Sequence, residues 1–347
     1  MKHITLLLLV WIAGACSPAY VLRAGYEEAK ILRRRQPITR VVADPRTPPA
    51  QRAKLALVLE ARTFAEHGLK LDVGDSYTTF SQLDSDTLAL VLSAAHQDRF
   101  KAHTWWFPIV GRVPYKGFFS ERKARREIAE LERRGLDTYL RPTSAFSTLG
   151  WFNDPLVSPL LRYDSVNLAN TVVHELFHNT LYVSGQAAFN ESLANFVGSR
   201  GAIHFFCARD ERLCEQARSE WHDELLFGGF LSEVVRELEL LYARTDLDRA
   251  GKLAAREKVF TRARRAFAEE VRPRFRGRGV GSFERLPLNN ATLISRRLYY
   301  QRLDLFEQVF ERNQRNLQHT IAEIVSVAKG SRDPYAAVEQ LVSATVC

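Results

Sequence analysis

The chain has 347 residues, of which 46% are hydrophobic and 26% charged, a composition that fits a globular protein and excludes a disordered or fibrous one. The length predicts one large domain or two of ordinary size. The formal net charge of +9 is concentrated in residues 251–281, which hold ten Lys or Arg against three Glu. We interpret this segment as a solvated helix face followed by an Arg/Gly loop, with contact to an anionic membrane as the alternative.

The first fifteen residues have the pattern of a signal peptide. Lys2 and His3 precede an apolar run that is too short to span a bilayer, and small residues lead up to Cys16. The sequence Ile-Ala-Gly-Ala-Cys is similar to a bacterial lipobox, so we expect cleavage before Cys16 and a lipid on that residue, with plain secretion as the alternative. The predicted location is the bacterial cell envelope, anchored to a membrane and facing the periplasm. Ser17 after the cysteine favours the outer membrane, and export excludes nucleic acid as a partner.

The mature chain is predicted to be α+β and predominantly α-helical. Residues 16–50 are interpreted as a lipid-anchored N-terminal helix and linker, and residues 51–347 as a single domain. Aromatic and β-branched residues broken by Pro and Gly predict a small β-sheet over about 104–152. Within this range, a charged helix is predicted from Ser120 to about Arg134. Apolar spacing predicts the remaining helices over about 51–66, 84–95, 165–205, 211–244, 248–271 and 290–329.

One predicted helix carries the sequence His-Glu-x-x-His. His174 and His178 are four residues apart, so their imidazoles lie one turn apart on the same face and can bind one metal ion. The rest of this helix is mostly apolar, which places it in a core, where two histidines and a carboxylate are costly unless a metal compensates them. Glu175 adjoins the expected ion and can take a proton from metal-bound water. A surface helix with two solvated histidines is the alternative.

Glu191 is the candidate for a third metal ligand. A hydrolytic zinc needs three protein ligands and an open position. Glu191 stands thirteen residues after His178, at the expected start of an apolar helix, and Gly185 suits a turn between two antiparallel helices. Asn195 lies four residues further on, where it can hydrogen-bond the outer nitrogen of a ligand histidine. We therefore expect one zinc ion per chain.

Two further patterns concern structure more than chemistry. Cys207 and Cys214 lie seven residues apart around an expected turn, so a local disulfide is one pairing in an oxidising compartment, and it would leave Cys347 alone. Asn289 and Asn290 precede the last long predicted helix. We interpret Asn290 as the cap of that helix, with a substrate contact as the alternative.

Together these motifs resemble the gluzincin metallopeptidases. More closely, the lipobox start and the runs His-Glu-Leu-Phe-His-Asn-Thr-Leu-Tyr, Phe-Asn-Glu-Ser-Leu-Ala-Asn-Phe-Val-Gly and Leu-Asn-Asn-Ala look like those of a bacterial lipoprotein family described as predicted zinc aminopeptidases. The resemblance implies that His174, His178 and Glu191 bind zinc and that Glu175 is the general base. Two features depart from the thermolysin-like pattern. Only twelve residues separate His178 from Glu191, fewer than in those enzymes, and Asn195 stands where they have Asp.

Gluzincins often use a Tyr or a His to stabilise the oxyanion. The candidates are Tyr182, His204 and Tyr163, with Tyr115 and Tyr300 as further ones, and no spacing selects among them. The predicted function is zinc-dependent hydrolysis of peptide bonds, with aminopeptidase selectivity and a peptide as substrate. The alternatives are a zinc endopeptidase or other zinc hydrolase of the cell envelope, and a non-catalytic scaffold that zinc stabilises. Glu175 separates these classes, because a scaffold has no use for a base beside the metal.

Overall fold

The computed structural model describes residues 25–26, 29–85, 87–107, 111–143, 154–277, 283 and 286–343. The protein is mostly helical with small sheets, which confirms the predicted α+β class. The predicted signal peptide with Cys16, residues 145–152 and Cys347 lie outside the described residues. Within the described ranges, none of the helices combines the length and hydrophobicity that a membrane span requires.

Helices make up most of the described chain, from the N-terminal third to the C-terminal end. The α-helices are α3 (Ile38–Ala43), α4 (Pro49–His67), α5 (Glu121–Arg133), α6 (Ser165–Thr180), α7 (Ala187–Cys207), α8 (Glu211–Ala243), α9 (Arg249–Ala266), α10 (Asn290–Tyr300), α11 (Leu303–Arg312), α12 (Leu317–Ala328) and α13 (Pro334–Ser343). The strands are β1 (Gln36–Pro37), β2 (Thr79–Ser81), β3 (Ala89–His96), β4 (Trp105–Phe107), β5 (Gly111–Val113), β6 (Tyr115–Phe118), β7 (Leu136–Thr143) and β8 (Leu156–Val157).

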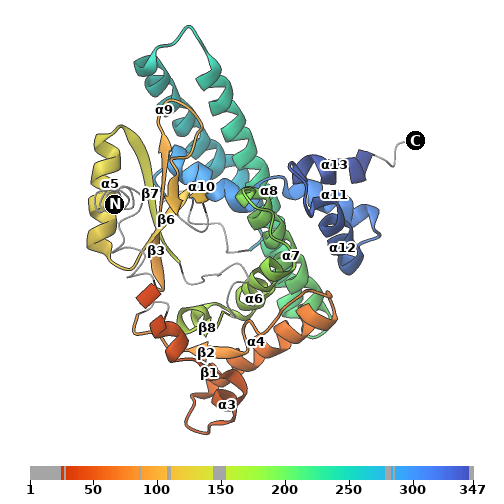
Figure 1. Cartoon of the computed structure of the whole chain (residues 1–347). Helices are drawn as coiled ribbons and strands as arrows, with labels where there is room; N and C mark the ends of the chain where they lie inside the picture. The colour runs from red at the N-terminus through yellow and green to blue at the C-terminus, as the bar shows by residue number, and fades with distance from the viewer. Residues whose placement is uncertain are drawn as a thin grey trace, which may run out of the picture.

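The antiparallel pair α6 and α7 lies at the centre of the molecule (Figure 1). α4 packs on α6, whereas α8, α10 and α11 pack on α7. Asp164 begins α6, because its side chain accepts a hydrogen bond from the Asn167 N–H at 3.0 Å. The largest hydrophobic core forms around this pair. Phe196 of α7 lies in it, with its ring centroid 5.7 Å from that of Phe306 in α11.

A buried asparagine closes the short connector between the two central helices. The Asn190 amide accepts a hydrogen bond from the Val183 N–H and donates one to the Val183 carbonyl, both at 2.9 Å. Gly185 turns the chain with a φ of 76°, in the left-handed region. Because the turn is this tight, α7 begins at Ala187 and not at Glu191 as predicted.

A three-stranded antiparallel sheet, ordered β6-β3-β7, stands beside the helical core. α5 covers one face of it and α10 the other (Figure 1). The prediction of a helix over 84–95 was wrong, since β3 occupies residues 89–96. Leu92 and Ala94 of β3 face α5, and Ala95 packs with Ala291 of α10. A strand buried on both faces is continuously apolar, so periodicity could not distinguish it from a helix.

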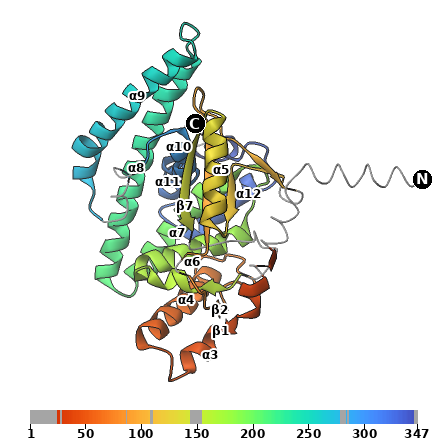
Figure 2. The same ribbon diagram turned by 90° about the vertical axis from the view of Figure 1, so that its left-hand side faces the viewer.

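α8 and α9 form a long hairpin that projects from the body of the molecule (Figure 2). The start of α8 is joined to the end of α7 by a disulfide between Cys207 and Cys214, with a Cα–Cα distance of 4.5 Å. α9 is tied to the sheet by Arg256, whose guanidinium forms a buried ion pair with Asp137 of β7 at 2.7 Å. One basic residue of the 251–281 segment is therefore structural.

The C-terminal region contains several helices in place of the single helix predicted over 290–329. The chain turns at Arg302, with a φ of 55°, and again at Gln314 and Arg315. The cap of α10 is Asn289, whose Oδ1 accepts from the Thr292 N–H at 2.9 Å. Asn290, the predicted cap, is fully buried and binds the Tyr242 hydroxyl and the His96 carbonyl instead.

α6 and α7 approach closely because α7 has a glycine at the contact. A Cβ on Gly198 would lie 2.4 Å from Asn170 Oδ1, 2.9 Å from the Asn170 carbonyl oxygen and 3.0 Å from His174 Cβ. No other residue type fits there without moving one helix. The spacing between the His-Glu-x-x-His helix and its partner therefore depends on this position.

We expect Gly198→Ala to destabilise the protein by about 1–3 kcal/mol, because the added methyl group overpacks the contact. Gly229→Ala is the matched control. Gly229 is also in a helix, but a Cβ there meets nothing within 4 Å. The control should be neutral or stabilising by up to about 1 kcal/mol, through the better helix propensity of Ala. Urea unfolding of both variants measures the difference, and equal stability of the two would contradict the close contact.

Candidate metal centre

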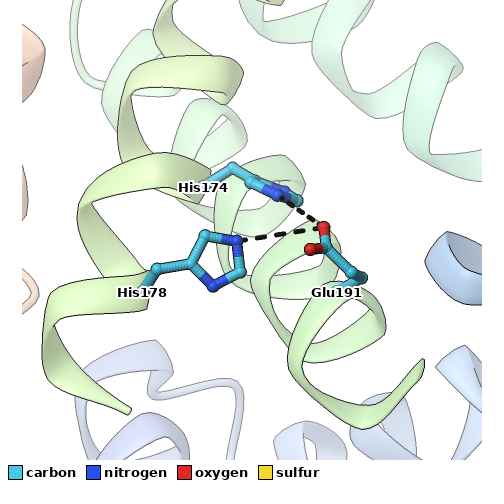
Figure 3. Close-up of side chains that lie close together, drawn as sticks. All are labelled: His174, His178 and Glu191. Atoms are coloured by element: carbon cyan, nitrogen blue, oxygen red, sulfur yellow. Dashed lines mark ion pairs between the residues drawn. The ribbon is translucent and has the colours of Figure 1, made fainter. Parts of the chain in front are cut away.

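The three predicted metal ligands converge. His174 and His178 project from one face of α6, and Glu191 projects toward them from α7 (Figure 3). Glu191 Oε2 lies 3.4 Å from His174 Nε2 and 3.9 Å from His178 Nε2. The three side chains are 11%, 3% and 21% exposed in chain order, so the cluster lies inside the protein with the carboxylate nearest to solvent.

The donor set fits a zinc ion. One ligand atom from each residue lies within 4.8 Å of the other two. Four donors at about 2.0–2.1 Å from a tetrahedral zinc lie about 3.3 Å apart, so the observed separations need only a small contraction. Two imidazoles and one carboxylate also leave a fourth position for a water or substrate oxygen. The described residues contain no other cluster of this kind.

The electrostatics of the cluster also suit a cation. Burial lowers the pKa of His178 to about 4, so its imidazole is neutral. Burial raises the pKa of Glu191, but the opposing effects, of which the hydrogen bond with His174 is the largest, leave that pKa below its usual value. His174 shows the converse: burial lowers its pKa, but the Glu191 hydrogen bond and the charges of the neighbouring carboxylates together outweigh burial and raise that pKa. A proton shared by these two groups lies where a metal ion would bind, and metal binding would release it.

Glu175 lies beside the triad in a less polar setting. Burial is the main cause that raises its pKa to about 7, and the charges of Glu191 and Asp154 add to this. Tyr77 lies near the same carboxylate, and burial raises its pKa well above the usual value. A carboxyl group with a pKa near neutral pH is suited to general acid–base work.

Asn195 was predicted to hydrogen-bond a ligand histidine, but its side chain binds other groups. Its Nδ2 donates to Glu224 Oε2 at 3.0 Å and to the Tyr299 carbonyl at 3.1 Å. Ser192, on the same helix, donates its hydroxyl to the Leu298 carbonyl at 2.9 Å. The last carbonyls of a helix have no partner within it, so these two side chains hold the end of α10 against α7. The outer nitrogen of His178, Nδ1, is buried and has no hydrogen-bond partner among the described residues.

Glu224 of α8 is a site residue that the sequence did not reveal. Its carboxylate accepts from Asn195 and, at 3.2 Å, from the Ser199 hydroxyl, which in turn accepts from Asn170 of α6 at 3.1 Å. This polar network joins α6, α7 and α8 behind His174. Burial raises the pKa of Glu224 to about 7. No motif indicates this residue, because the members of the network come from three different helices.

The structure separates the predicted oxyanion donors. His204 lies against Phe310 and is thirteen residues beyond Glu191, roughly 20 Å along α7, so it cannot reach the site. Tyr163 packs against the core at the start of α6, and Tyr300 turns away toward Phe227, with ring centroids 5.1 Å apart. Tyr182 lies in the connector with 47% of its surface exposed.

Two tyrosines lie at the triad: Tyr115, which is one of the predicted candidates, and Tyr299, which the sequence did not suggest. The Tyr299 ring centroid is 6.2 Å from that of His174, and Tyr115 lies near enough to Glu191 for that charge to raise its pKa. Burial of the phenol is the larger cause and takes the pKa of Tyr115 to about 12, although the residue as a whole is 37% exposed. Burial likewise raises the pKa of Tyr299. Both phenols therefore stay protonated and can donate a hydrogen bond.

The fold and the site define a mostly helical protein with a candidate metal centre made from an HExxH helix and a glutamate of the neighbouring helix. The chain belongs to the family described as "Putative aminopeptidase", which matches residues 19–336. This match confirms the aminopeptidase family that the motifs indicate, and its description names a peptidase. No curated protein and no solved structure matches the chain.

The raised pKa of Glu224 predicts a pH-dependent stability. The unfolded carboxyl ionises near its ordinary pKa of 4.5, whereas the folded one stays neutral up to about pH 7. The stability that this difference contributes is complete below about pH 4.5 and is lost as the pH rises through 7. Glu224→Gln cannot ionise, so in metal-free protein it should reduce this loss by on the order of 2 kcal/mol.

Urea unfolding at pH 5 and pH 8 measures the effect. Glu233→Gln, on the exposed face of the same helix, is the control. If wild type, control and Glu224→Gln lose the same stability over this range, the carboxyl group does not have the neutral state assigned to it.

Proposed function

We propose that the protein is a zinc-dependent peptidase with aminopeptidase-like selectivity. The observation that supports this proposal most directly is the convergence of His174, His178 and Glu191 in the interior of the protein. Glu175 lies beside these three residues. The family description supports the peptidase class. The position of Glu175 favours an enzyme over a scaffold, because a buried carboxyl with a raised pKa costs stability and serves no structural bond among the described contacts.

In this proposal His174, His178 and Glu191 hold zinc. The chemistry that a bound zinc supplies is polarisation of the scissile carbonyl and a lowered pKa of water. Glu175 takes the proton of the attacking water and passes it to the leaving amine. Tyr299 and Tyr115 are the candidates to donate a hydrogen bond to the developing oxyanion, because each remains a phenol at neutral pH.

A cleavage assay with free and N-blocked peptides, with and without a chelator, tests the proposal. We expect cleavage of free amino termini that the chelator removes and zinc restores. Glu175→Gln should retain one zinc per chain and lose about 10²–10⁴ in rate, because only the base is removed. His178→Ala should lose zinc as well as activity.

Each outcome of that assay has a separate meaning. Cleavage of N-blocked peptides would indicate an endopeptidase and contradict the aminopeptidase selectivity. Full activity of Glu175→Gln would show that Glu175 is not the general base. Full zinc occupancy of His178→Ala would show that His178 is not a zinc ligand. Zinc binding without cleavage of any peptide would support the alternative function, a non-catalytic scaffold that zinc stabilises.

We also propose that a lipid on Cys16 holds the protein to the cell envelope, facing the periplasm. The support is the apolar leader and the lipobox-like sequence before Cys16. Mass spectrometry of the mature N-terminus should find a diacylglyceryl cysteine. An unmodified Cys16 at the mature N-terminus would indicate plain secretion.

A further inference from the structure

Arg141 of β7 is a partly buried cation that forms no ion pair with any described residue. Its Nη2 lies 3.3 Å from the Tyr299 hydroxyl, and its guanidinium carbon lies 5.8 Å from the centroid of that ring. Among the described residues, no carboxylate lies within ion-pair distance of it. Two other guanidinium groups that are largely buried do form ion pairs, Arg256 with Asp137 and Arg200 with Glu307. An arginine that leaves water without a carboxylate or phosphate partner is unusual.

A second arginine lies on the facing helix. Arg296 of α10 has one Nη2 contact, 3.5 Å from the Tyr139 hydroxyl, and its buried Nε has no partner among the described residues. Tyr139 and Arg141 alternate along β7 and therefore share the face toward α10. Arg296 and Tyr299 are three residues apart and share a face of α10. Two guanidinium groups thus lie between β7 and α10, which pack side by side (Figure 1).

This positive region adjoins the metal centre. Tyr299 lies between Arg141 and His174, with its ring centroid 6.2 Å from that of the histidine. With the 5.8 Å on the other side, the guanidinium carbon is at most about 12 Å from the His174 ring, a span that about three residues of extended peptide cover. The charge of Arg141 also reaches the site, where it helps to lower the pKa of Glu191 and offsets part of the rise in the pKa values of Tyr115 and Tyr299.

We propose that Arg141 binds a carboxylate of the substrate, within about three residues of the scissile bond. The guanidinium fork matches a carboxylate in two parallel hydrogen bonds, and a partly desolvated site strengthens this pairing. The carboxylate is either the C-terminus of a short peptide or an acidic side chain at the same distance. Such a contact selects short or acidic peptides over long neutral ones. This inference rests on the proposed peptidase function.

Three matched tripeptides test it: one with a free C-terminal carboxylate, one with a C-terminal amide, and one amidated with Glu as its last residue. Zinc-loaded wild-type protein should cleave the free peptide at least about tenfold faster in kcat/KM than the neutral amide. Arg141→Gln should bring that ratio to about one, with little change on the neutral amide. Arg141→Lys keeps the charge but not the fork, and should give an intermediate ratio. The amidated Glu peptide identifies the source: cleavage as fast as the free peptide means that an acidic side chain suffices.

Arg297→Gln is the control for charge alone. It removes one positive charge from α10, the helix that carries Tyr299. Arg297 differs from Arg141 because it forms an ion pair with Glu239. This variant should keep the wild-type preference. A calorimetric Kd for each peptide on zinc-loaded Glu175→Gln protein, with and without Arg141→Gln, measures binding without turnover and should show the same preference.

Equal kcat/KM and equal Kd for all three peptides in wild type would overturn the proposal. So would an equal fall on all peptides in Arg141→Gln, because Arg141 would then act only through Tyr299. If no peptide is cleaved but the Kd preference is present and depends on Arg141, the peptidase function fails while the carboxylate site stands.

Discussion

The contact between α6 and α7 at Gly198 is the constraint on which the rest of the site depends. α6 carries two histidines and a glutamate in a face that is otherwise apolar, and α7 brings one carboxylate to them. Backbone and His174 Cβ come so near to Gly198 that a methyl group would not fit. Asn190 closes the connector, which keeps the hairpin short. Both helices lie in the main core. The two histidines and the Glu191 carboxylate are therefore held together at a cost in free energy that a bound cation would offset.

α10 joins the candidate metal centre to the sheet. Its first turn is fixed by Asn289 and by the buried contacts of Asn290, and its last carbonyls are held by Ser192 and Asn195 of α7. This arrangement sets Tyr299 beside His174 and Arg141. Asn195 therefore has a structural function that the comparison with thermolysin-like enzymes did not suggest. The side chain stands next to the metal ligands in sequence, but it satisfies the end of another helix and the carboxylate of Glu224.

Predictions from the sequence were accurate where a pattern is local. The long helices α4 and α8 and the charged helix α5 begin and end near the predicted residues. Errors arose where burial hides the period or where tertiary contacts decide an end. β3 is apolar on both faces and was taken for a helix, and α7 begins a turn early because Asn190 supports the connector. The predicted helix over 290–329 divides at residues with positive φ, which the sequence does not mark with Gly or Pro.

By itself, the sequence determined the chemistry that can occur at the centre. Histidines four residues apart on an apolar helix, an adjacent glutamate and a second glutamate after a short turn are local facts, and helix geometry alone brings most of them to one place. Only the tertiary structure decided what surrounds them. Tyr299, Tyr115, Glu224 and Arg141 come from α10, β6, α8 and β7, so no spacing along the chain relates them to the triad. Their positions follow from how α8 and α10 pack on α7 and how the sheet packs on α10, and side chains brought together by such packing leave no periodic signal in the sequence.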